Sequence, residues 1–294
     1  MRGLYLLAND RVSRLAVTVA ASVRRHEPEV PIFVVPYDDR AQAVLGLLAE
    51  AFGALPFPDR SLLAELDRLT ALHIPAGTLR NPTRLRKLAC WLGPLDEFLY
   101  LDCDIVVFDR ILTALDHLDH ADFLWCDYQH RRLPDFVFRP SIFEEGVLDP
   151  ALGGEIFNTG FLASRRGLFT LSELALHLRE IGGLVRHLPF AKGVNDQPVL
   201  NYLVLRHVAR RKNLVRLPGW RANAHPLGLY RVDDDYRPFD PAVGEPHKYL
   251  HWSGFRIEPG DPYWEVWRHH HERAQRQFDG APARHATAEE RACC

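Results

Sequence analysis

The sequence predicts an α/β protein in which a parallel sheet is covered by helices. Apolar, β-branched strand signals alternate with helical segments over the first hundred residues, and this β-α-β-α order is typical of parallel sheets with ligands at the carboxyl ends of their strands. A chain of 294 residues with 47% hydrophobic content buries a substantial core. There is no internal repeat and no sharp break in composition. We therefore expect a single domain over residues 1–278 and a disordered polar tail over residues 279–294.

Elements of the first half are expected where apolar runs show strand or helix periodicity. In order, they are a strand at Leu4–Leu7, a helix at Val12–Arg25, a strand at Ile32–Val35, a helix at Ala41–Phe52 and a helix at Pro82–Trp91. The last helix begins with a proline, which suits the first helical position, and Gly93-Pro94 stops it. It leads directly into an apolar strand that begins at Phe98.

The second half continues with shorter elements and longer connections. In order, we expect a helix at Ile111–Leu118, strands at Phe123–Cys126 and Phe157–Ala163, helices at Leu168–Ile181 and Asp196–Arg206, a strand at Tyr249–Trp252 and a helix from Pro262 to about Phe278. The stretch from Gln129 to Gly154 lacks periodicity and is expected to be a long loop. Prolines and glycines dominate from Gly219 to Gly260, which predicts irregular structure around the short strand.

The most informative stretch is FLYLDCDIVVFD, from Phe98 to Asp109. Alternation along an extended backbone places Asp102 and Asp104 on one face and Cys103 on the other. Two carboxylates at the end of a core strand repel each other unless a cation lies between them. Mg²⁺ and Mn²⁺ prefer such oxygen ligands, often together with substrate phosphates. The alternative is a strand that simply ends in a solvated acidic turn.

Composition excludes several classes of partner. With 36 basic and 38 acidic residues, the chain carries no global field that favours nucleic acid or an anionic membrane. No segment approaches the length of a transmembrane span, and the N-terminal apolar run is too short for a signal peptide. Five scattered cysteines argue for a reducing compartment, so we expect a cytoplasmic protein.

Polar residues lie at the ends of four further core elements. These stretches are Asn9-Asp10, Asn158-Thr159-Gly160, Asn195-Asp196-Gln197 and His251-Trp252-Ser253-Gly254. Each also has a structural explanation, because the first and third would cap helices, the second would form a turn, and His251 would be a hydrogen-bonded core histidine. Together with the acidic pair, the set points to a functional site.

The order of these stretches resembles glycosyltransferase family 8, the glycogenin-like and lipopolysaccharide hexosyltransferases. Asp102-Cys103-Asp104 is similar to the family's DxD motif, and His251-Trp252-Ser253-Gly254 is similar to its closing HxxG. Lys87-Leu88-Ala89-Cys90-Trp91 resembles a segment just upstream of the acidic motif. The match spans roughly residues 3 to 256. It implies a GT-A-type fold, in which a mixed central sheet has flanking helices.

The resemblance also assigns roles to the site residues. It implies that Mn²⁺ (or Mg²⁺) is held by Asp102, Asp104 and His251, where it would stabilise the diphosphate as the glycosidic bond breaks. Catalytic residues facing the donor sugar would be Asn158, Asp196 and Gln197. The nucleotide would be bound by Asn9, Asp10, Asp38, Lys87, Asp102 and Arg256. Arg256 would substitute for a phosphate-contacting lysine of the family, and Arg11-Val12 stands where glycogenin-like proteins carry a tyrosine that stacks on uracil.

The expected activity is transfer of a hexose from a nucleotide-diphosphate sugar, with a UDP-sugar favoured and retention of configuration inherited from the family. The acceptor would be a glycan, a lipid-linked molecule or a protein. A first alternative is a haloacid-dehalogenase-type phosphatase, because Asp102-Cys-Asp104-Ile-Val also fits its motif, with Asp102 as nucleophile. A second is a catalytically inactive protein that binds nucleotide sugars.

Overall fold

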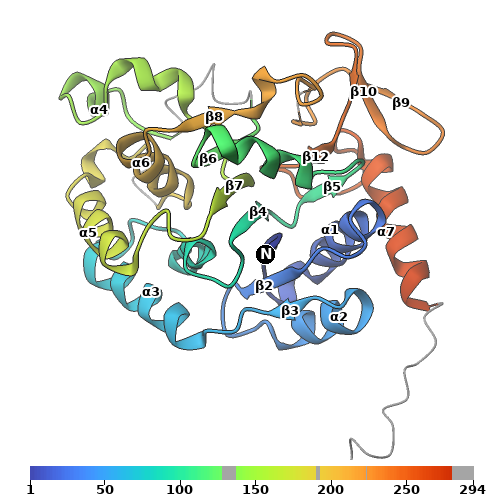
Figure 1. Cartoon of the computed structure of the whole chain (residues 1–294), viewed down its shortest axis with the longest axis horizontal. Helices are drawn as coiled ribbons and strands as arrows, with labels where there is room; N and C mark the ends of the chain where they lie inside the picture. The colour runs from blue at the N-terminus through green and yellow to red at the C-terminus, as the bar shows by residue number, and fades with distance from the viewer. Residues whose placement is uncertain (128–136, 190–192, 223, 280–294) are drawn as a thin grey trace, which may run out of the picture.

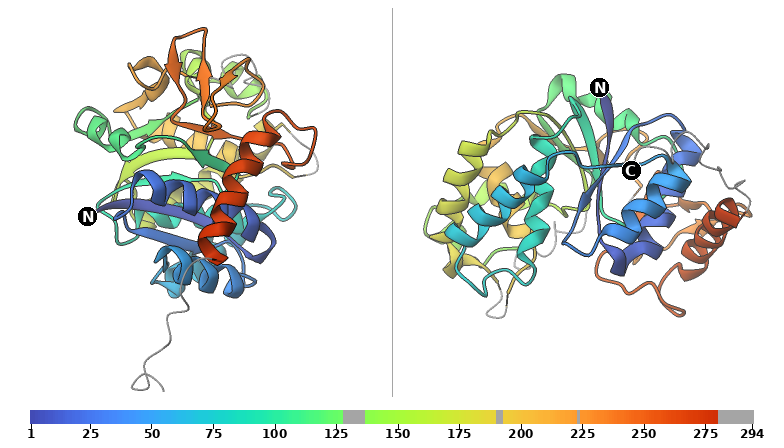
Figure 2. Two further views of the ribbon diagram at one scale, coloured as in Figure 1. Left: turned by 90° about the vertical axis from the view of Figure 1, so that its right-hand side faces the viewer. Right: turned by 90° about the horizontal axis from the view of Figure 1, so that it is seen from below.

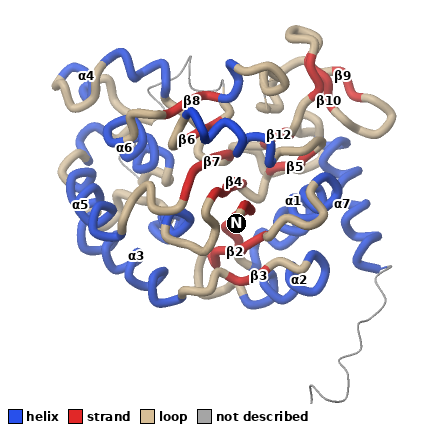
Figure 3. The backbone as a smooth tube through the Cα atoms, in the orientation of Figure 1, coloured by secondary structure: helices blue, strands red, loops and turns tan. Residues whose placement is uncertain are grey.

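The computed structural model describes residues 1–127, 137–189, 193–222 and 224–279. A seven-stranded sheet lies at the centre, between two layers of helices, as Figures 1 and 2 show. The tube in Figure 3 shows the strands running through the middle of the molecule, with helices on both flanks. The predicted α/β class and the mixed sheet with flanking helices are both confirmed.

The sheet has the strand order β3-β2-β1-β4-β7-β6-β8. Its strands are β1 (Arg2–Ala8), β2 (Ile32–Pro36), β3 (Leu55–Pro56), β4 (Glu97–Leu101), β6 (Phe123–Trp125), β7 (Phe161–Arg165) and β8 (Arg211–Asn213). Strands β3, β2, β1 and β4 are parallel, whereas β7 is antiparallel to both β4 and β6. The connection after β1 leads to β2 on one side, and the connection after β3 crosses to β4 on the other side of β1. The carboxyl end of β1 is therefore a topological switch point.

Alternation along the strands divides the core between the two faces of the sheet. On β1, Tyr5 and Leu7 point to one face, whereas Leu4 and Leu6 point to the other. Helices α3 (Arg60–His73), α5 (Leu171–Gly182) and α6 (Gln197–His207) cover the first face. Helices α1 (Ser13–His26) and α2 (Gln42–Phe52) cover the second face, and α7 (Trp264–Asp279) packs outside α1.

A second, two-stranded sheet brings the C-terminal segment to the end of β4. Strand β12 (Tyr249–His251) pairs antiparallel with β5 (Ile105–Val107), and the register places His251 opposite Ile105. The predicted short strand near Tyr249 is therefore confirmed. The region around it is less irregular than expected, since β9 (Arg231–Val232), β10 (Pro238–Asp240) and β11 (Glu245–Pro246) form a small antiparallel sheet.

Other elements differ from the prediction in informative ways. The strand expected from Phe157 begins only at Phe161, because Asn158 Oδ1 accepts a hydrogen bond from Gly160 N and holds residues 158–160 in a turn. Helix α3 has no predicted counterpart, although Asp59 caps it and its leucines recur at helical spacing. The helical segments Pro82–Trp91 and Leu112–His120 are 3-10 helices.

The described part of the long 129–154 segment packs onto the core. It contains α4 (Ser141–Glu144), and a 3-10 helix at Pro150–Glu155 follows. Phe138 is buried and Phe143 packs against the same core cluster, so these two rings do not form an exposed lid. The rest of that loop, residues 128–136, and the predicted tail beyond Asp279 lie outside the described residues. No helix in the described ranges has both the length and the apolar character needed to cross a bilayer.

Replacing Gly46 with alanine is expected to stabilise the protein by about 0.5–1 kcal/mol, since glycine is a poor helix former. Gly46 is exposed within α2, and a Cβ there would meet no atom within 4 Å. Urea denaturation would measure the change. Gly53, which ends the same helix at φ 60°, is the matched control and should lose stability on the same substitution. A gain at Gly53 would contradict this reasoning.

Candidate active site

Two adjoining pockets open at the carboxyl ends of β1, β2 and β4, at the switch point of the sheet. Their volumes are about 380 and 320 Å³. Both are lined by Asp102, Asp104, Asp196, Arg84 and Asn81, so they form one continuous groove. A groove of this size accommodates a small-molecule ligand.

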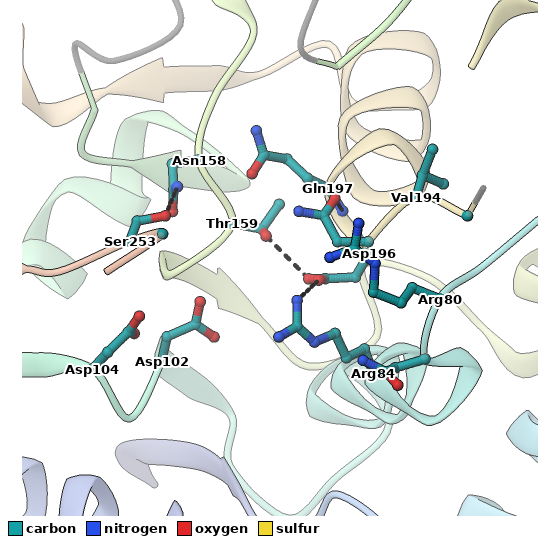
Figure 4. Close-up of a pocket in the computed structure, with 14 residues that line it drawn as sticks. Arg80, Arg84, Asp102, Asp104, Asn158, Thr159, Val194, Asp196, Gln197 and Ser253 are labelled. Carbon is teal, nitrogen blue, oxygen red and sulfur yellow. Dashed lines mark hydrogen bonds and ion pairs between the residues drawn. The ribbon is translucent and has the colours of Figure 1, made fainter. Parts of the chain in front are cut away.

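The acidic pair lies at the shared wall of the two pockets. Strand β4 ends at Leu101, the buried Cys103 turns away toward Leu7 O, and β5 begins at Ile105. The intervening carboxylates, Asp102 and Asp104, therefore lie side by side at one side of the larger pocket, as Figure 4 shows. The prediction that they share one face is confirmed.

His251 completes a triad with the two carboxylates. Its Nε2 lies 3.1 Å from Asp104 Oδ1 and 3.9 Å from Asp102 Oδ2. Pairing of β12 with β5 fixes this approach. Trp252, the residue after His251, also donates a hydrogen bond from its backbone N–H to Asp104 O. Burial lowers the pKa of His251, but the nearby Asp104 and Asp102 carboxylates outweigh it and the pKa lies above its ordinary value.

Gly160 provides the space that the His251 ring occupies. A Cβ built on Gly160 would lie 2.1 Å from His251 Cε1 and 2.8 Å from both ring nitrogens. The backbone at Gly160 is held on both sides, because its carbonyl accepts from Asp102 N and its N–H donates to Asn158 Oδ1. Only glycine therefore fits against the ring at this position.

These three side chains fit a divalent cation. Among the described residues, the buried His251 Nε2 has no aligned hydrogen-bond partner, although Asp104 Oδ1 lies 3.1 Å away. Adjacent ligands of an octahedral ion with bonds of about 2.1 Å lie about 3.0 Å apart, which matches that separation. Asp102 is one-third exposed, so its carboxylate has the freedom to close the longer gap. An ion at this place would supply the partner that the imidazole lacks.

Lys87 lies beneath the triad rather than in open solvent. Its ammonium donates to Asp196 Oδ2 at 2.7 Å, to Thr159 O at 3.0 Å and to Asp102 Oδ1 at 3.4 Å. The side chain is 4% exposed and its charge lies over the Tyr100 ring. Burial lowers the pKa of Lys87, but the two carboxylates outweigh it and raise the pKa above its usual value. The ammonium thus holds Asp102 and Asp196 in place.

Asp102 is oriented from below by two donors. Tyr100 OH donates to Asp102 Oδ1 at 2.6 Å, and Lys87 approaches the same oxygen. The other oxygen, Oδ2, faces His251. One carboxylate oxygen is therefore fixed by the protein and the other is directed at the cation site, which is how supporting hydrogen bonds orient metal ligands.

Asp196 and Gln197 reach the groove from the N-terminus of α6. Thr159 Oγ1 donates to Asp196 Oδ2 at 3.0 Å, and Arg84 lies 3.7 Å from Asp196 Oδ1 (Figure 4). Gln197 follows as the first residue of the helix and lines the larger pocket. The structure thus brings both predicted residues to the groove.

Asn158 also lines the larger pocket, and both ends of its amide are engaged. Oδ1 holds the turn at Gly160, and Nδ2 donates to Ser253 Oγ at 3.0 Å. The side chain therefore links the turn before β7 to the segment after β12. Its predicted contact with a sugar stays a prediction.

The residues predicted to bind the nucleotide separate into two groups. Asn9, Lys87 and Asp102 line the smaller pocket. Of the described residues that line either pocket, none is Asp10, Asp38 or Arg256. Asp10 Oδ1 accepts from Val44 N at the start of α2, Asp38 Oδ2 accepts from Asn9 Nδ2, and Arg256 is exposed. Asp38 therefore orients Asn9, which lines the smaller pocket, and Asp10 stabilises the start of α2.

The residues of the groove that the sequence analysis missed include Arg84 and Tyr37. Arg84 lines both pockets, is 43% exposed at its side chain, and donates from Nε to Tyr37 OH at 3.2 Å. Tyr37 lines the smaller pocket beyond β2. A clue was available, since Arg84 lies one helical turn before Lys87 and Tyr37 ends a strand at the same edge.

No family model matches the sequence, and no curated protein sequence matches it. Solved structures do match. The galactosyltransferase LgtC in complex with donor and acceptor sugar analogs has a TM-score of 0.59 and 17% identity, covering 99% of both chains. The WbbM bifunctional glycosyltransferase has a TM-score of 0.61 and 12% identity over 94% of this chain and 51% of that one. Mouse xyloside xylosyltransferase 1 has a TM-score of 0.53 and 14% identity over 73% and 85%.

The chain has the GT-A fold of glycosyltransferases. The sheet order and the place of the acidic pair agree with this assignment, and the fold implied by the resemblance to family 8 is confirmed. The phosphatase alternative requires its acidic motif after the first strand of the fold, whereas Asp102 follows β4. The fold therefore contradicts the phosphatase alternative.

Proposed function

We propose that this protein is a metal-dependent glycosyltransferase that moves a hexose from a nucleotide-diphosphate sugar, with a UDP-sugar as the favoured donor, to a glycan, lipid-linked or protein acceptor. The observation that carries the proposal is the buried His251 Nε2, which has no aligned hydrogen-bond partner among the described residues and lies beside Asp102 and Asp104. The two carboxylates line a groove at the carboxyl edge of a GT-A sheet, and His251 lines a small cavity that shares Asn158 with that groove.

The two pockets of the groove differ in polarity, the smaller having the larger apolar share, and this suits the two halves of such a donor. The smaller pocket includes Leu7, Val12, Tyr37 and Asn9, which together offer apolar surface and one amide for a base and ribose. The larger pocket includes Asn158, Thr159, Asn195, Gln197 and Ser253, whose amides and hydroxyls would hydrogen-bond a sugar. The acidic pair lies between these parts, where the diphosphate would be.

The reaction breaks the bond from the sugar's anomeric carbon to the diphosphate and forms a bond to an acceptor oxygen. Mn²⁺ or Mg²⁺ held by Asp102, Asp104 and His251 would supply Lewis-acid stabilisation to the diphosphate leaving group. Arg84 would add a second positive charge, since it lines both pockets and its side chain remains partly exposed. Gln197 and Asn158 would position the sugar hydroxyls.

Retention of configuration is part of the proposal. Among the described residues that line the groove, the carboxylates are Asp102, Asp104 and Asp196. The first two face the cation site, and Asp196 is tied to Lys87 and Thr159, which makes it a poor nucleophile. We therefore favour departure and attack on the same face of the sugar, with the leaving phosphate accepting the acceptor's proton. An inverted product in an NMR assay of anomeric configuration would contradict this mechanism.

The proposed location is cytoplasmic. Cys90, Cys103 and Cys126, three buried cysteines among the described residues, are free thiols, as in a reducing compartment.

A nucleotide panel tests the function directly. UDP with Mn²⁺ is expected to raise the melting temperature more than UDP or Mn²⁺ alone, because the ion bridges the triad and the diphosphate. The wild-type protein should also hydrolyse or transfer from the matching sugar nucleotide. Other nucleoside diphosphates in the panel identify the base.

The variant Asp104→Asn should abolish the joint effect of metal and nucleotide. Asp109→Asn is the matched control. Asp104 precedes β5 and Asp109 follows it, and Asp109 forms an ion pair with Lys248 rather than with His251. The proposal fails if no nucleoside diphosphate stabilises the wild-type protein in a metal-dependent way. It also fails if Asp104→Asn behaves as Asp109→Asn does.

A further inference from the structure

A second cluster of metal-ligating side chains lies away from the groove, between α5 and α6. His177 and Glu180 lie one turn apart on α5, and His207 is the last residue of α6. We call these three residues the α5–α6 cluster. Figure 1 shows the two helices side by side on one flank, and they are in direct contact. From Gln197 in the groove to His207, ten residues of helix span about 15 Å, so the cluster is separate from the active site.

The ligand atoms of the cluster converge. Glu180 Oε2 lies 3.3 Å from His177 Nδ1 and 3.2 Å from His207 Nε2, and all three ligand atoms lie within 4.8 Å of one another. Two ligands of a tetrahedral zinc ion with bonds of about 2.0–2.1 Å lie about 3.3 Å apart. Both nitrogen-to-oxygen separations match that edge. The contact between His177 and Glu180 is also a hydrogen bond, longer than is typical of a charge-assisted one.

One nitrogen of the cluster has no aligned hydrogen-bond partner among the described residues. His207 Nε2 is buried, and the Glu180 oxygen at 3.2 Å lies off the direction in which an N–H would donate. In a tetrahedral site the carboxylate oxygen also lies off the nitrogen's axis, since the ion occupies that axis. A buried polar atom without a partner costs free energy, and an ion would satisfy it.

The cluster is accessible from solvent. The side chains of His207 and Glu180 are 22% and 38% exposed, so an ion can approach. The His177 and His207 rings stack with centroids 3.7 Å apart, and the Phe169 ring lies edge-on to His177. Because stacked rings hold their nitrogen lone pairs in separate planes, binding of one ion by both nitrogens requires one ring to rotate out of the stack.

We propose that His177, Glu180 and His207 bind a tetrahedral first-row transition-metal ion, best matched by Zn²⁺, with water as the fourth ligand. Two imidazoles and one carboxylate form a zinc donor set, whereas Mg²⁺ prefers oxygen ligands alone. The ion would join α5 to the C-terminal end of α6. Because the N-terminal end of α6 carries Asp196 and Gln197 into the groove, the site would stabilise the helix that builds one wall of the active site.

Zinc titration of the full-length chain tests the proposal in a background that lacks the other cation site. The background Asp104→Asn/His251→Ala removes two ligands of the triad, so the result does not depend on the proposed transferase activity. Isothermal titration calorimetry with ZnCl₂ should show one equivalent bound, and Co²⁺ should give the visible absorption of a tetrahedral centre. Zn²⁺ should also raise the melting temperature of this background.

Two further substitutions, made separately in that background, decide the outcome. Glu180→Gln keeps the side-chain shape and His207→Ala removes the unpartnered nitrogen, and each should weaken zinc binding at least 10-fold and remove the tetrahedral cobalt spectrum. His120→Ala, an exposed histidine outside the cluster, is the control and should change neither. If Glu180→Gln and His207→Ala bind Zn²⁺ as tightly as the background does, or if the background binds none, the cluster is only a carboxylate between two imidazoles and the proposal is overturned.

Discussion

Replacing Lys87 with methionine is expected to lower the free energy of unfolding by about 3–5 kcal/mol, the cost of removing one partner from a buried ion pair. Lys87 and Asp196 are 4% and 5% exposed at their side chains and lie 2.7 Å apart. Methionine fills similar space but leaves the Asp196 carboxylate buried without its strongest donor. Urea denaturation of the two proteins measures the difference.

The same change should lower kcat/KM for sugar transfer by about 10–100-fold, the range seen when a supporting hydrogen bond to a metal ligand is lost. Lys87 approaches the Asp102 oxygen that Tyr100 also holds, so its loss frees a cation ligand to move. The effect on activity should persist in assays well below the melting temperature of the variant, because it arises from orientation and not from unfolding.

A double substitution separates the two effects. Lys87→Met/Asp196→Asn removes both buried charges and should recover most of the lost stability, because the carboxylate that remains, Asp102, is one-third exposed to water. Activity should stay low, since Asp102 still lacks its donor and the groove has lost Asp196. If Lys87→Met alone unfolds as readily as the wild-type protein, the buried ion pair does not contribute as described. Recovered activity in the double variant would contradict the orienting role of Lys87.

Most of the fold was predictable because its strands and helices carry strong local signals. The apolar runs that became β1, β2, β4 and β6 end at polar turns, and the amphipathic helices follow at regular intervals. Local sequence signals do not show which strands pair with each other. The antiparallel insertion of β7 between β4 and β6 depends on contacts among segments far apart in sequence. Strand β8 was missed because its residues, Arg211–Asn213, are polar at the edge of the sheet.

The candidate site shows the same division between local and distant information. Asp102 and Asp104 were predictable from a strand that ends in two carboxylates, and their partner His251 from a family motif. The role of Lys87 could not be predicted, because the sequence does not reveal that its ammonium donates hydrogen bonds to Asp196 and to Thr159 O. Lys87 thus organises two carboxylates, and its predicted contact with the nucleotide stays a prediction. Arg84, one turn earlier, is the more exposed cation in the groove.

If the proposed function is right, replacing Gly160 with alanine should weaken Mn²⁺-dependent binding of the nucleotide at least about 100-fold, because it displaces His251, a proposed metal ligand, rather than a supporting group. The new methyl group would lie 2.1 Å from His251 Cε1. The backbone at residue 160 cannot shift away from the ring, because both its N–H and its carbonyl are hydrogen-bonded. The imidazole must therefore move, and the triad loses its nitrogen ligand. Titration of Mn²⁺ in the presence of the nucleotide measures the loss.

Two companion variants distinguish displacement of His251 from general damage. Overpacking at Gly160 should cost about 1–3 kcal/mol of stability. Gly160→Ala/His251→Ala should recover stability, because the smaller side chain makes room for the methyl group, but it should not recover metal binding. Gly154→Ala is the control, since a Cβ there meets nothing within 4 Å, and it should leave metal binding unchanged. Wild-type affinity for Mn²⁺ in Gly160→Ala would show that His251 does not bind the ion, and the cation site would then rest on the two carboxylates alone.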